Sequence, residues 1–367
     1  MTNAPVAVQE FGQSIWLDNL SRDIIRSDEL QRLIDEDGVV GITTNPSIFE
    51  KAVSGGSAGY DDTILRLLDE DDPHVIYEAL ALEDVAAAAD ILRPVYARTR
   101  GLDGYVSLEV SPFIAHDTGA TVEEAQRLHR ALGRPNVFIK IPATPEGIPA
   151  IEASIAAGVS VNVTLMFALQ NYAEVAQAYI RGLERRKAAG EPVDRIASVA
   201  SFFLSRIDTY VDRELPEGSP LRGRAAIASA RLAYAHFEAT FRDARFRALE
   251  QAGARLQRVL WASTSTKNPA YPDLHYVEPL IGPHTVNTMP PHTLAAFKDH
   301  GTAALTLTQG LNEANDFMQD LARAGVDLDA ITAQLQADGV AAFADAFRKL
   351  LDGVRARRDA LRAAQPA

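Results

Sequence analysis

The sequence of 367 residues contains no cysteine. This absence excludes disulfide bonds, thiolate metal sites and a cysteine nucleophile. The eight histidines are scattered along the chain, and none belongs to an HExxH or similarly paired metal-binding motif. Any chemistry must therefore be carried out by other side chains.

Positive charge is also scarce: 36 Lys and Arg residues stand against 49 Asp and Glu residues, and the formal net charge is −13. Nucleic-acid binders usually gather a basic excess in a patch, because much of their affinity comes from neutralising phosphates. We therefore expect no nucleic-acid partner.

Signals for export and for membranes are missing as well. Residues 1–13 lack a basic segment followed by an apolar one, and the uncharged stretch 153–173 is interrupted by polar residues. We expect no secretory signal, no membrane partner and a cytoplasmic location. The sequence is compatible with either a monomer or a homodimer.

Apolar residues, in contrast, are plentiful and make up 47% of the chain. Short runs rich in β-branched residues alternate with longer amphipathic segments, which is typical of βα units around a parallel sheet. We expect strands at 14–17, 39–43, 105–110, 137–141, 159–165, 197–202, 259–262 and 285–287. Eight strands close a (β/α)₈ barrel, the TIM barrel, and this α/β fold is our prediction. Because the first and last strand signals are the weakest, an open sheet of seven strands is the alternative.

Helices are expected between these strands. The segments 121–124 and 47–50 have the pattern of capping boxes, which mark helix starts. The segments 172–186 and 225–249 carry charges on one side and predict further helices. We expect one barrel domain over 1–367.

Outside the barrel we expect an N-terminal extension over 1–13 and a C-terminal helical segment over about 322–367 that packs on the barrel.

Within the C-terminal segment, 328–364 predicts one or two helices, with Gly339 and Gly353 as weak points. We expect the arginines of 355–358 to lie on a solvated helix face. The Gly-rich segment 54–59 does not sit directly between a strand and a helix, so a flexible surface loop is favoured over a phosphate cradle.

Polar and ionisable side chains stand at the carboxyl ends of the expected strands. A (β/α)₈ barrel builds its active site there, from the strand ends and the loops that follow them. In chain order the residues are Asp18, Thr43 to Asn45, Glu109, Lys140, Asn162, Thr164, Ser201, Arg206 and the segment 263–267, which ends at Lys267. Several such residues at equivalent ends indicate a functional site.

Lys140 is the most informative of them, because apolar residues flank it on both sides and lysine is rarely buried without a purpose. Burial disfavours the ammonium form and makes the amine a nucleophile able to form a Schiff base with a carbonyl substrate. An edge-strand or snorkelling lysine is the alternative.

Schiff-base chemistry needs proton transfers, and two carboxylates are available for them. Asp18 and Glu109 lie on different strands and both are expected at the barrel mouth. Their alternative role is a structural ion pair with Arg22 or another basic loop residue. Thr164 could relay a proton through a bound water, or it could be a strand threonine chosen for its β propensity.

Four ordered motifs resemble the transaldolase family: Gly41-Ile-Thr-Thr-Asn-Pro-Ser47, Val106-Ser-Leu-Glu-Val-Ser-Pro112, Val137-Phe-Ile-Lys-Ile-Pro-Ala143 and Val161-Asn-Val-Thr-Leu-Met-Phe167. The resemblance continues through 200–206 and 261–268, so it covers the chain from about Asp18 to Met289. The strand that holds Lys140 is its most specific piece.

The resemblance implies a role for each of the matching residues. Lys140 would be the Schiff-base lysine, and Asp18 the general acid/base that takes the proton of the C4 hydroxyl as the C3–C4 bond breaks. Glu109 and Thr164 would hold a catalytic water. Asn45 and Asn162 would orient the dihydroxyacetone unit, and Ser201 with Arg206 would bind the substrate phosphate.

The sequence departs from the family pattern in the loop after the seventh strand. A second phosphate-binding arginine is expected there, and the nearest match is Lys267, which follows two extra residues within 263–266. Lysine is a common phosphate ligand but acts as a point charge rather than as a fork.

The implied activity is that of a transaldolase in the non-oxidative pentose phosphate pathway, with phosphorylated sugars as substrates. It would move a dihydroxyacetone unit from sedoheptulose 7-phosphate or fructose 6-phosphate to glyceraldehyde 3-phosphate or erythrose 4-phosphate. The chemistry needs no metal and no cofactor, because the protonated imine stabilises the carbanion. A lysine-dependent aldolase that releases free dihydroxyacetone and a non-catalytic sugar-phosphate-binding barrel are the alternatives.

Overall fold

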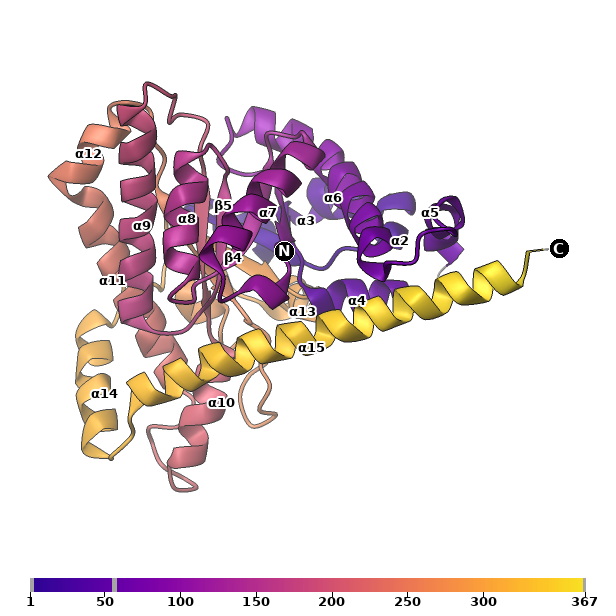
Figure 1. Cartoon of the computed structure of the whole chain (residues 1–367). Helices are drawn as coiled ribbons and strands as arrows, with labels where there is room; N and C mark the ends of the chain where they lie inside the picture. Colours follow the sequence, from indigo (N-terminus) through magenta and orange to yellow (C-terminus); the bar gives the residue numbers. More distant parts are fainter. Residues whose placement is uncertain (1–2, 55–57, 366–367) are drawn as a thin grey trace.

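Eight parallel strands close into a barrel in sequence order, with β8 pairing back onto β1 (Figure 1). The structure is a computed structural model that describes residues 3–54 and 58–365. The strands are β1 (Gln13–Asp18), β2 (Val39–Thr43), β3 (Tyr105–Glu109), β4 (Val137–Pro142), β5 (Val161–Met166), β6 (Ser198–Phe203), β7 (Gln257–Ala262) and β8 (Thr285–Met289). The predicted TIM barrel is confirmed, and the alternative of an open sheet is wrong.

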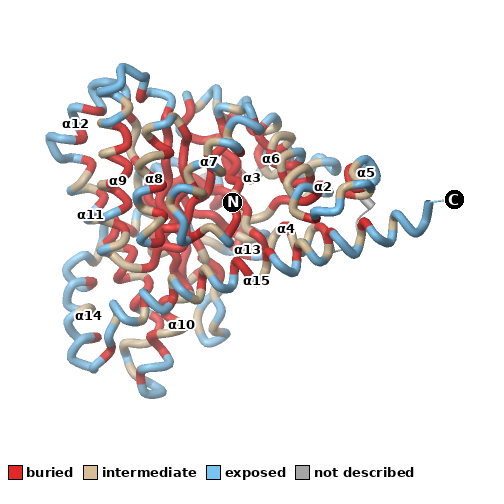
Figure 2. Tube along the Cα trace, in the orientation of Figure 1, coloured by how far each residue is buried: buried red, intermediate tan, exposed pale blue. Residues whose placement is uncertain are grey.

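The two weakest strand signals belong to the strands that close the barrel. β1 and β8 pair from Gln13 with Thr285 to Leu17 with Met289. Every strand residue is buried except Asp18 and Glu109, which are half-buried at strand ends, and Figure 2 shows the buried residues gathered in the interior of the molecule. Both faces of such a sheet are covered, which explains why the strands read as apolar runs rather than as alternating patterns.

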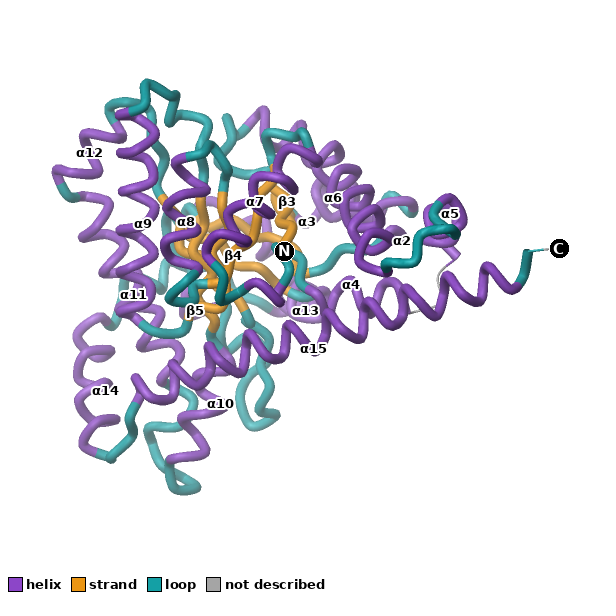
Figure 3. The backbone as a smooth tube through the Cα atoms, in the orientation of Figure 1, coloured by secondary structure: helices purple, strands orange, loops and turns teal. Residues whose placement is uncertain are grey.

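Helices surround the strands, as Figure 3 shows in purple around orange. They are α1 (Ala4–Ala7), α2 (Arg22–Arg26), α3 (Glu29–Asp37), α4 (Pro46–Ser54), α5 (Asp61–Arg66), α6 (Pro73–Arg98), α7 (Thr118–Leu132), α8 (Gly147–Ala156), α9 (Leu169–Ala188), α10 (Ser205–Glu214), α11 (Ala225–Arg242), α12 (Ala244–Glu250), α13 (Pro291–His300), α14 (Leu311–Arg323) and α15 (Leu328–Ala363). Among the described residues, no helix is long and apolar enough to cross a membrane.

Both predicted capping boxes are wrong, because the helices start earlier than their sequences suggest. The carboxylate of Asp117 accepts a hydrogen bond from the backbone N–H of Ala120 and caps α7, which leaves Thr121 inside the helix. The side-chain oxygen of Asn45 accepts a hydrogen bond from the backbone N–H of Ile48, so Asn45 rather than Ser47 caps α4, which begins at Pro46.

The predicted helix over 225–249 is two helices. Asp243 interrupts it with an extended backbone (φ −67°, ψ 151°), and its carboxylate accepts a hydrogen bond from the N–H of Arg245 to cap α12. The predicted helix over 172–186 is confirmed as part of α9. The Gly-rich segment 54–59 lies partly outside the described residues, which end at Ser54 and resume at Ala58.

The C-terminal segment forms one unbroken helix, α15, through both of its glycines. The solvated face predicted for 355–358 is wrong for Arg358, whereas Arg355 is exposed and Arg357 keeps 37% of its side chain exposed. Arg358 is buried and donates to the carbonyl of Glu70, and both ends of the Arg357 guanidinium donate to Asp61. Folding of α15 onto α4, α5 and α6 explains this burial.

α15 runs along the carboxyl end of the barrel, past α4 and α10, before its last turns extend along α5 (Figure 1). The side-chain amide of Gln336 donates hydrogen bonds to the carbonyls of Ala143 and Leu165, which lie at the ends of β4 and β5. The helix therefore forms a wall of the barrel mouth.

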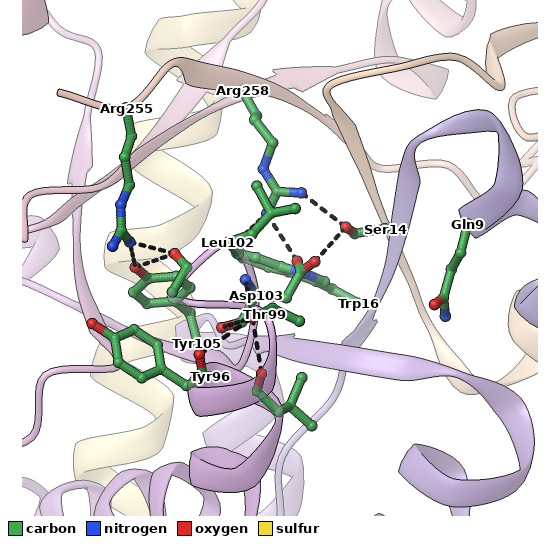
Figure 4. A network of polar contacts seen from close by, with 12 residues as sticks. Gln9, Ser14, Trp16, Tyr96, Thr99, Leu102, Asp103, Tyr105, Arg255 and Arg258 are labelled. Atoms are coloured by element: carbon green, nitrogen blue, oxygen red, sulfur yellow. Dashed lines mark hydrogen bonds and ion pairs between the residues drawn. The ribbon is translucent and has the colours of Figure 1, made fainter. Parts of the chain in front are cut away.

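The opposite end of the barrel is closed by the N-terminal segment and by a buried polar network (Figure 4). The N-terminal extension is described from Asn3 and ends at residue 12, because β1 begins at Gln13. Its Gln9 side-chain amide donates a hydrogen bond to the carbonyl of Gly38. The carboxylate of Asp103 accepts from Ser14 Oγ at 2.8 Å, Trp16 Nε1 at 3.0 Å and Arg258 Nη2 at 2.9 Å. These contacts join β1, β7 and the segment before β3.

Candidate active site

A cavity of about 690 Å³ opens at the carboxyl end of the barrel. Six of the predicted site residues line it: Asp18, Asn45, Lys140, Ser201, Arg206 and Lys267. Of the other three, Glu109 lies beside Lys140 and Asn162 accepts a hydrogen bond from Ser201, and both of these partners line the cavity. Thr164 is buried in β5, where it pairs with Pro142, two residues after Lys140. The strand ends and the segments that follow them thus bring the nine predicted catalytic and binding residues to one end of the barrel.

Lys140 lies in the middle of β4 with only 4% of its surface exposed. Its ammonium group donates a hydrogen bond to the carbonyl of Thr44 at 3.0 Å and lies 3.7 Å from Glu109 Oε2. A closed barrel has no edge strand, and a buried Nζ does not snorkel to solvent. Both structural alternatives for Lys140 are therefore wrong.

Glu109 stands directly beside Lys140, because the register of β3 and β4 pairs these two residues. Burial raises the pKa of Glu109 to about 7, and the charge of Lys140 opposes this rise. Within the described residues, Glu109 Oε2 and Thr164 Oγ1 are buried atoms without a hydrogen-bond partner. A carboxyl group with this pKa can both give and take a proton near neutral pH.

Asp18 ends β1, where the register pairs it with Thr43 of β2. Its Oδ1 accepts a hydrogen bond from Thr43 Oγ1 at 2.7 Å, and Thr43 Oγ1 lies 2.6 Å from Thr288 Oγ1. Burial raises the pKa of Asp18, although the positive charge of Lys140 lowers it in part.

The alternative ion pairs of the two carboxylates with Arg22 are wrong. Arg22 instead contacts Asp84 at 2.7 Å and Glu83 at 3.0 Å, away from the cavity. Asp18 forms no ion pair in the described part of the chain, and the cation beside Glu109 is Lys140 itself. Both carboxylates are therefore available to a ligand on Lys140.

Amide and hydroxyl groups continue the site across neighbouring strands. Asn162 Nδ2 donates to Ser107 Oγ at 3.0 Å, and Ser201 Oγ donates to Asn162 Oδ1 at 2.7 Å. Strand pairing places Asn162 next to Lys140. Asn45 uses its side-chain oxygen to cap α4, which leaves its N–H₂ group for the cavity that it lines.

Three cations line the rim of the cavity: Arg206 on α10, Lys267 in the loop after β7, and Lys51 on α4. None of them forms an ion pair with a carboxylate within the ranges that the structure describes. Burial lowers the pKa of Lys267, and the charges of Arg206 and Lys51 lower it further, so the three charges act on one another. Unpaired cations at one rim favour an anionic ligand group.

Among the cavity-lining residues that sequence reasoning missed are Lys51 and Phe343. Lys51 does not follow a strand end, but it shares a helix face with Ser47 and Ile48, which also line the cavity, and this spacing is visible in the sequence. Phe343 reaches the cavity from α15, and its ring centre lies 5.8 Å from Lys140 Nζ. No local signal places α15 over the barrel mouth.

Comparison with known proteins agrees with this geometry. The profile of the family described as Transaldolase/Fructose-6-phosphate aldolase matches residues 15–354. A protein named Transaldolase from Thiobacillus denitrificans is 50% identical over 350 residues, which cover 94% of this chain and 97% of that protein. Transaldolase 2 of a Nostoc species is 45% identical over 97% of each chain, and the Transaldolase of Neisseria gonorrhoeae is 48% identical over 94% of this chain and 97% of its own. The chain therefore belongs to the transaldolase/fructose-6-phosphate aldolase family of enzymes.

Proposed function

We propose that this enzyme transfers a dihydroxyacetone unit from a ketose phosphate to an aldose phosphate through a Schiff base on Lys140. The donor would be sedoheptulose 7-phosphate or fructose 6-phosphate, and the acceptor glyceraldehyde 3-phosphate or erythrose 4-phosphate. The observation that carries the proposal is the buried amine of Lys140, which lines the cavity beside Glu109. A buried lysine amine next to a proton acceptor is suited to attack a ketone carbon.

Formation of the imine begins with attack of the Lys140 amine on C2 of the ketose. The amine must first lose a proton, and Glu109 is the nearest base. The carbinolamine then loses water with help from the same carboxyl group. Thr164, whose buried hydroxyl has no partner in the described chain, would help to hold the water involved.

Cleavage of the C3–C4 bond follows. Asp18 takes the proton of the C4 hydroxyl, the C4 carbonyl forms, and the bonding electrons move into the imine to give an enamine. The aldose leaves, and a second aldose accepts the enamine carbon while Asp18 returns the proton to its carbonyl oxygen. Hydrolysis of the new imine releases the product and restores the Lys140 amine.

Binding groups surround this reaction centre. Asn45 and Asn162 would orient the hydroxyl groups of the three-carbon unit, and Ser201 with Arg206 and Lys267 would hold the phosphate. An arginine fork and a hydroxyl are well suited to phosphate oxygens. No metal or cofactor takes part in the proposed steps. We propose the cytoplasm as the compartment, because charged sugar phosphates do not cross bilayers unaided.

Borohydride trapping tests the covalent mechanism. Incubation with fructose 6-phosphate and borohydride should leave a reduced adduct, and peptide mass mapping should locate it on Lys140. Lys140→Arg keeps the charge but cannot form the imine, so it should show neither adduct nor turnover. Trapping on another residue, or substantial activity of the variant, would contradict the mechanism.

Acceptor dependence then separates transfer from simple aldol cleavage. With fructose 6-phosphate as donor, addition of erythrose 4-phosphate should accelerate the formation of glyceraldehyde 3-phosphate. A rate indifferent to the acceptor would favour an aldolase that releases free dihydroxyacetone.

A further inference from the structure

One aromatic side chain from the C-terminal helix covers the reactive amine. Phe343 has 6% of its surface exposed and lines the cavity together with Lys140. Lys140 Nζ also donates to the carbonyl of Thr44 and lies 3.7 Å from the carboxylate of Glu109. Phe343 thus adds an aromatic ring to the wall of the cavity that the amine lines, close to where a substrate bound to Nζ would lie.

α15 holds this ring in a fixed place. Two turns before Phe343 on the same helix face, Gln336 donates hydrogen bonds to the carbonyls of Ala143 and Leu165. Between them, Gly339 passes so close to Leu165 that an added Cβ would lie 2.9 Å from its Cδ2. Asp338 accepts a hydrogen bond from the hydroxyl of Tyr210 on α10 at 2.6 Å.

A second ring from the same helix lies one turn further on. Phe347 lines a narrow gap with Glu109 and Asn45, and its ring centre is 5.1 Å from that of Tyr77. Phe343 and Phe347 therefore present apolar surface to both members of the Lys140 and Glu109 pair. Apolar cover at a reaction centre restricts the access of bulk water.

We propose that Phe343 is a positioning residue that shields the enamine on Lys140 from bulk water and thereby favours transfer of the three-carbon unit over its release. This inference rests on the proposed function. The ring also presents its negative face toward the nitrogen that carries the positive charge of the iminium. The shield comes from α15, which carries none of the predicted catalytic residues.

The enamine has two fates that differ in what its nucleophilic carbon attacks. In transfer, its electron pair forms a C–C bond with the carbonyl carbon of the acceptor, and that oxygen takes a proton from Asp18. In release, the pair takes a proton that originates from water, and a C–H bond forms. Either iminium then adds one water at C2 and expels the Lys140 amine. Only release begins with protonation from water, so opening the cavity beside the enamine promotes release.

The test is the ratio of free dihydroxyacetone released to ketose formed by transfer, measured with fructose 6-phosphate and a fixed concentration of erythrose 4-phosphate. Phe343→Ala should raise this ratio about tenfold, because it opens the cavity on the side of the amine. Phe343→Leu is the matched control, since it keeps most of the apolar volume, and its ratio should stay within about twofold of the wild-type value.

Each variant is also trapped with borohydride, because a variant whose site is damaged would form less adduct on Lys140. Phe343→Val gives an intermediate opening and replaces the alanine variant if that variant does not fold; it too should raise the ratio. An unchanged ratio in a variant that traps the adduct on Lys140 normally would overturn the shielding role alone. Absence of the adduct on wild-type Lys140 would overturn the proposed function, and this inference with it.

Discussion

The reactivity proposed for Lys140 depends on a few neighbours that each supply one property. Glu109 supplies a proton acceptor 3.7 Å away, and the carbonyl of Thr44 fixes the direction of the amine. Phe343 supplies apolar cover. Because these groups come from β3, the turn after β2 and α15, the site depends on the closed barrel and on the helix that crosses its mouth.

The raised pKa of Glu109 predicts how the activity depends on pH. Its carboxyl group is ionised above about pH 7 and becomes protonated as the pH falls through that value. The ionised form is the one that can take a proton from the Lys140 ammonium, so kcat/KM should fall below about pH 7. Glu109→Gln should lower kcat/KM by roughly 10²–10⁴-fold and remove this acidic limb. The pH profiles of both proteins measure it, and an acidic limb that survives in the variant belongs to another group.

The rim cations make a prediction about phosphate binding. Lys267→Ala should raise KM for erythrose 4-phosphate by roughly tenfold or more, because a hydrogen bond to a charged group contributes about 1.5–3 kcal/mol. kcat should change little, and the KM for unphosphorylated glyceraldehyde should stay the same. Lys51→Ala should act in the same direction but more weakly, since its side chain is exposed. An unchanged KM in Lys267→Ala would remove Lys267 from the phosphate site.

How far the site could be predicted from the sequence depends on where each residue sits. Asp18, Glu109 and Lys140 lie in or at the ends of strands, and parallel strands in a barrel bring their carboxyl ends to one place. Lys51 and Phe343 lie on helices, and a helix reaches the site only if it packs in one orientation. That orientation is decided by tertiary contacts such as those of Gln336, which leave no local pattern.

At the scale of the elements, the strands were predicted more accurately than the helix ends. Most strands are buried segments rich in apolar and β-branched residues, so composition indicates their limits to within one or two residues. Helix starts depend on which of several candidate side chains caps the first turn. Asp117 caps α7 and Asn45 caps α4, although each is followed by a sequence with the capping-box pattern. Asp243 divides the segment 225–249, whose sequence predicts one continuous helix.

The position of α15 depends on the close approach of Gly339 to Leu165 of β5, and this contact can be tested by substitution. Gly339→Val should lower the free energy of unfolding by about 1–3 kcal/mol, since its side chain would meet Leu165 in a packed interface. kcat/KM should fall as well, because Phe343 and Gln336 lie on the same face. Gly119→Ala, on the exposed first turn of α7, is the control: an added Cβ there would meet only Asp117 Oδ1 at 3.5 Å, so the change should raise the free energy of unfolding by about 0.5–1 kcal/mol.

Urea unfolding and steady-state kinetics measure both glycine variants. If Gly339→Val kept both its stability and its kcat/KM, the close approach of α15 to β5 would be unimportant for the site.

At the scale of the whole molecule, the two ends of the barrel differ in how their charges are satisfied. At the carboxyl end, Lys51, Arg206 and Lys267 face the cavity without a carboxylate partner in the described ranges, although the net charge is −13. At the amino end, Arg258 and Asp103 form an ion pair whose side chains are only 6% and 7% exposed. Unpaired cations suit a binding site, and paired buried charges suit a structural closure.

This division predicts that the amino end can be weakened without loss of function. Asp103→Ala removes the acceptor of three hydrogen bonds and leaves the buried guanidinium of Arg258 unpaired, so the free energy of unfolding should fall by about 3–5 kcal/mol. Asp90→Ala is the matched control: it breaks a more exposed ion pair with Arg134, and its effect should stay below about 1 kcal/mol. Urea unfolding measures the stability of both variants. In assays at urea concentrations well below the unfolding transition, the KM and kcat of both variants should equal the wild-type values. A changed KM in Asp103→Ala would mean that the closure at the amino end also sets the geometry of the cavity, because neither Asp103 nor Arg258 lines it.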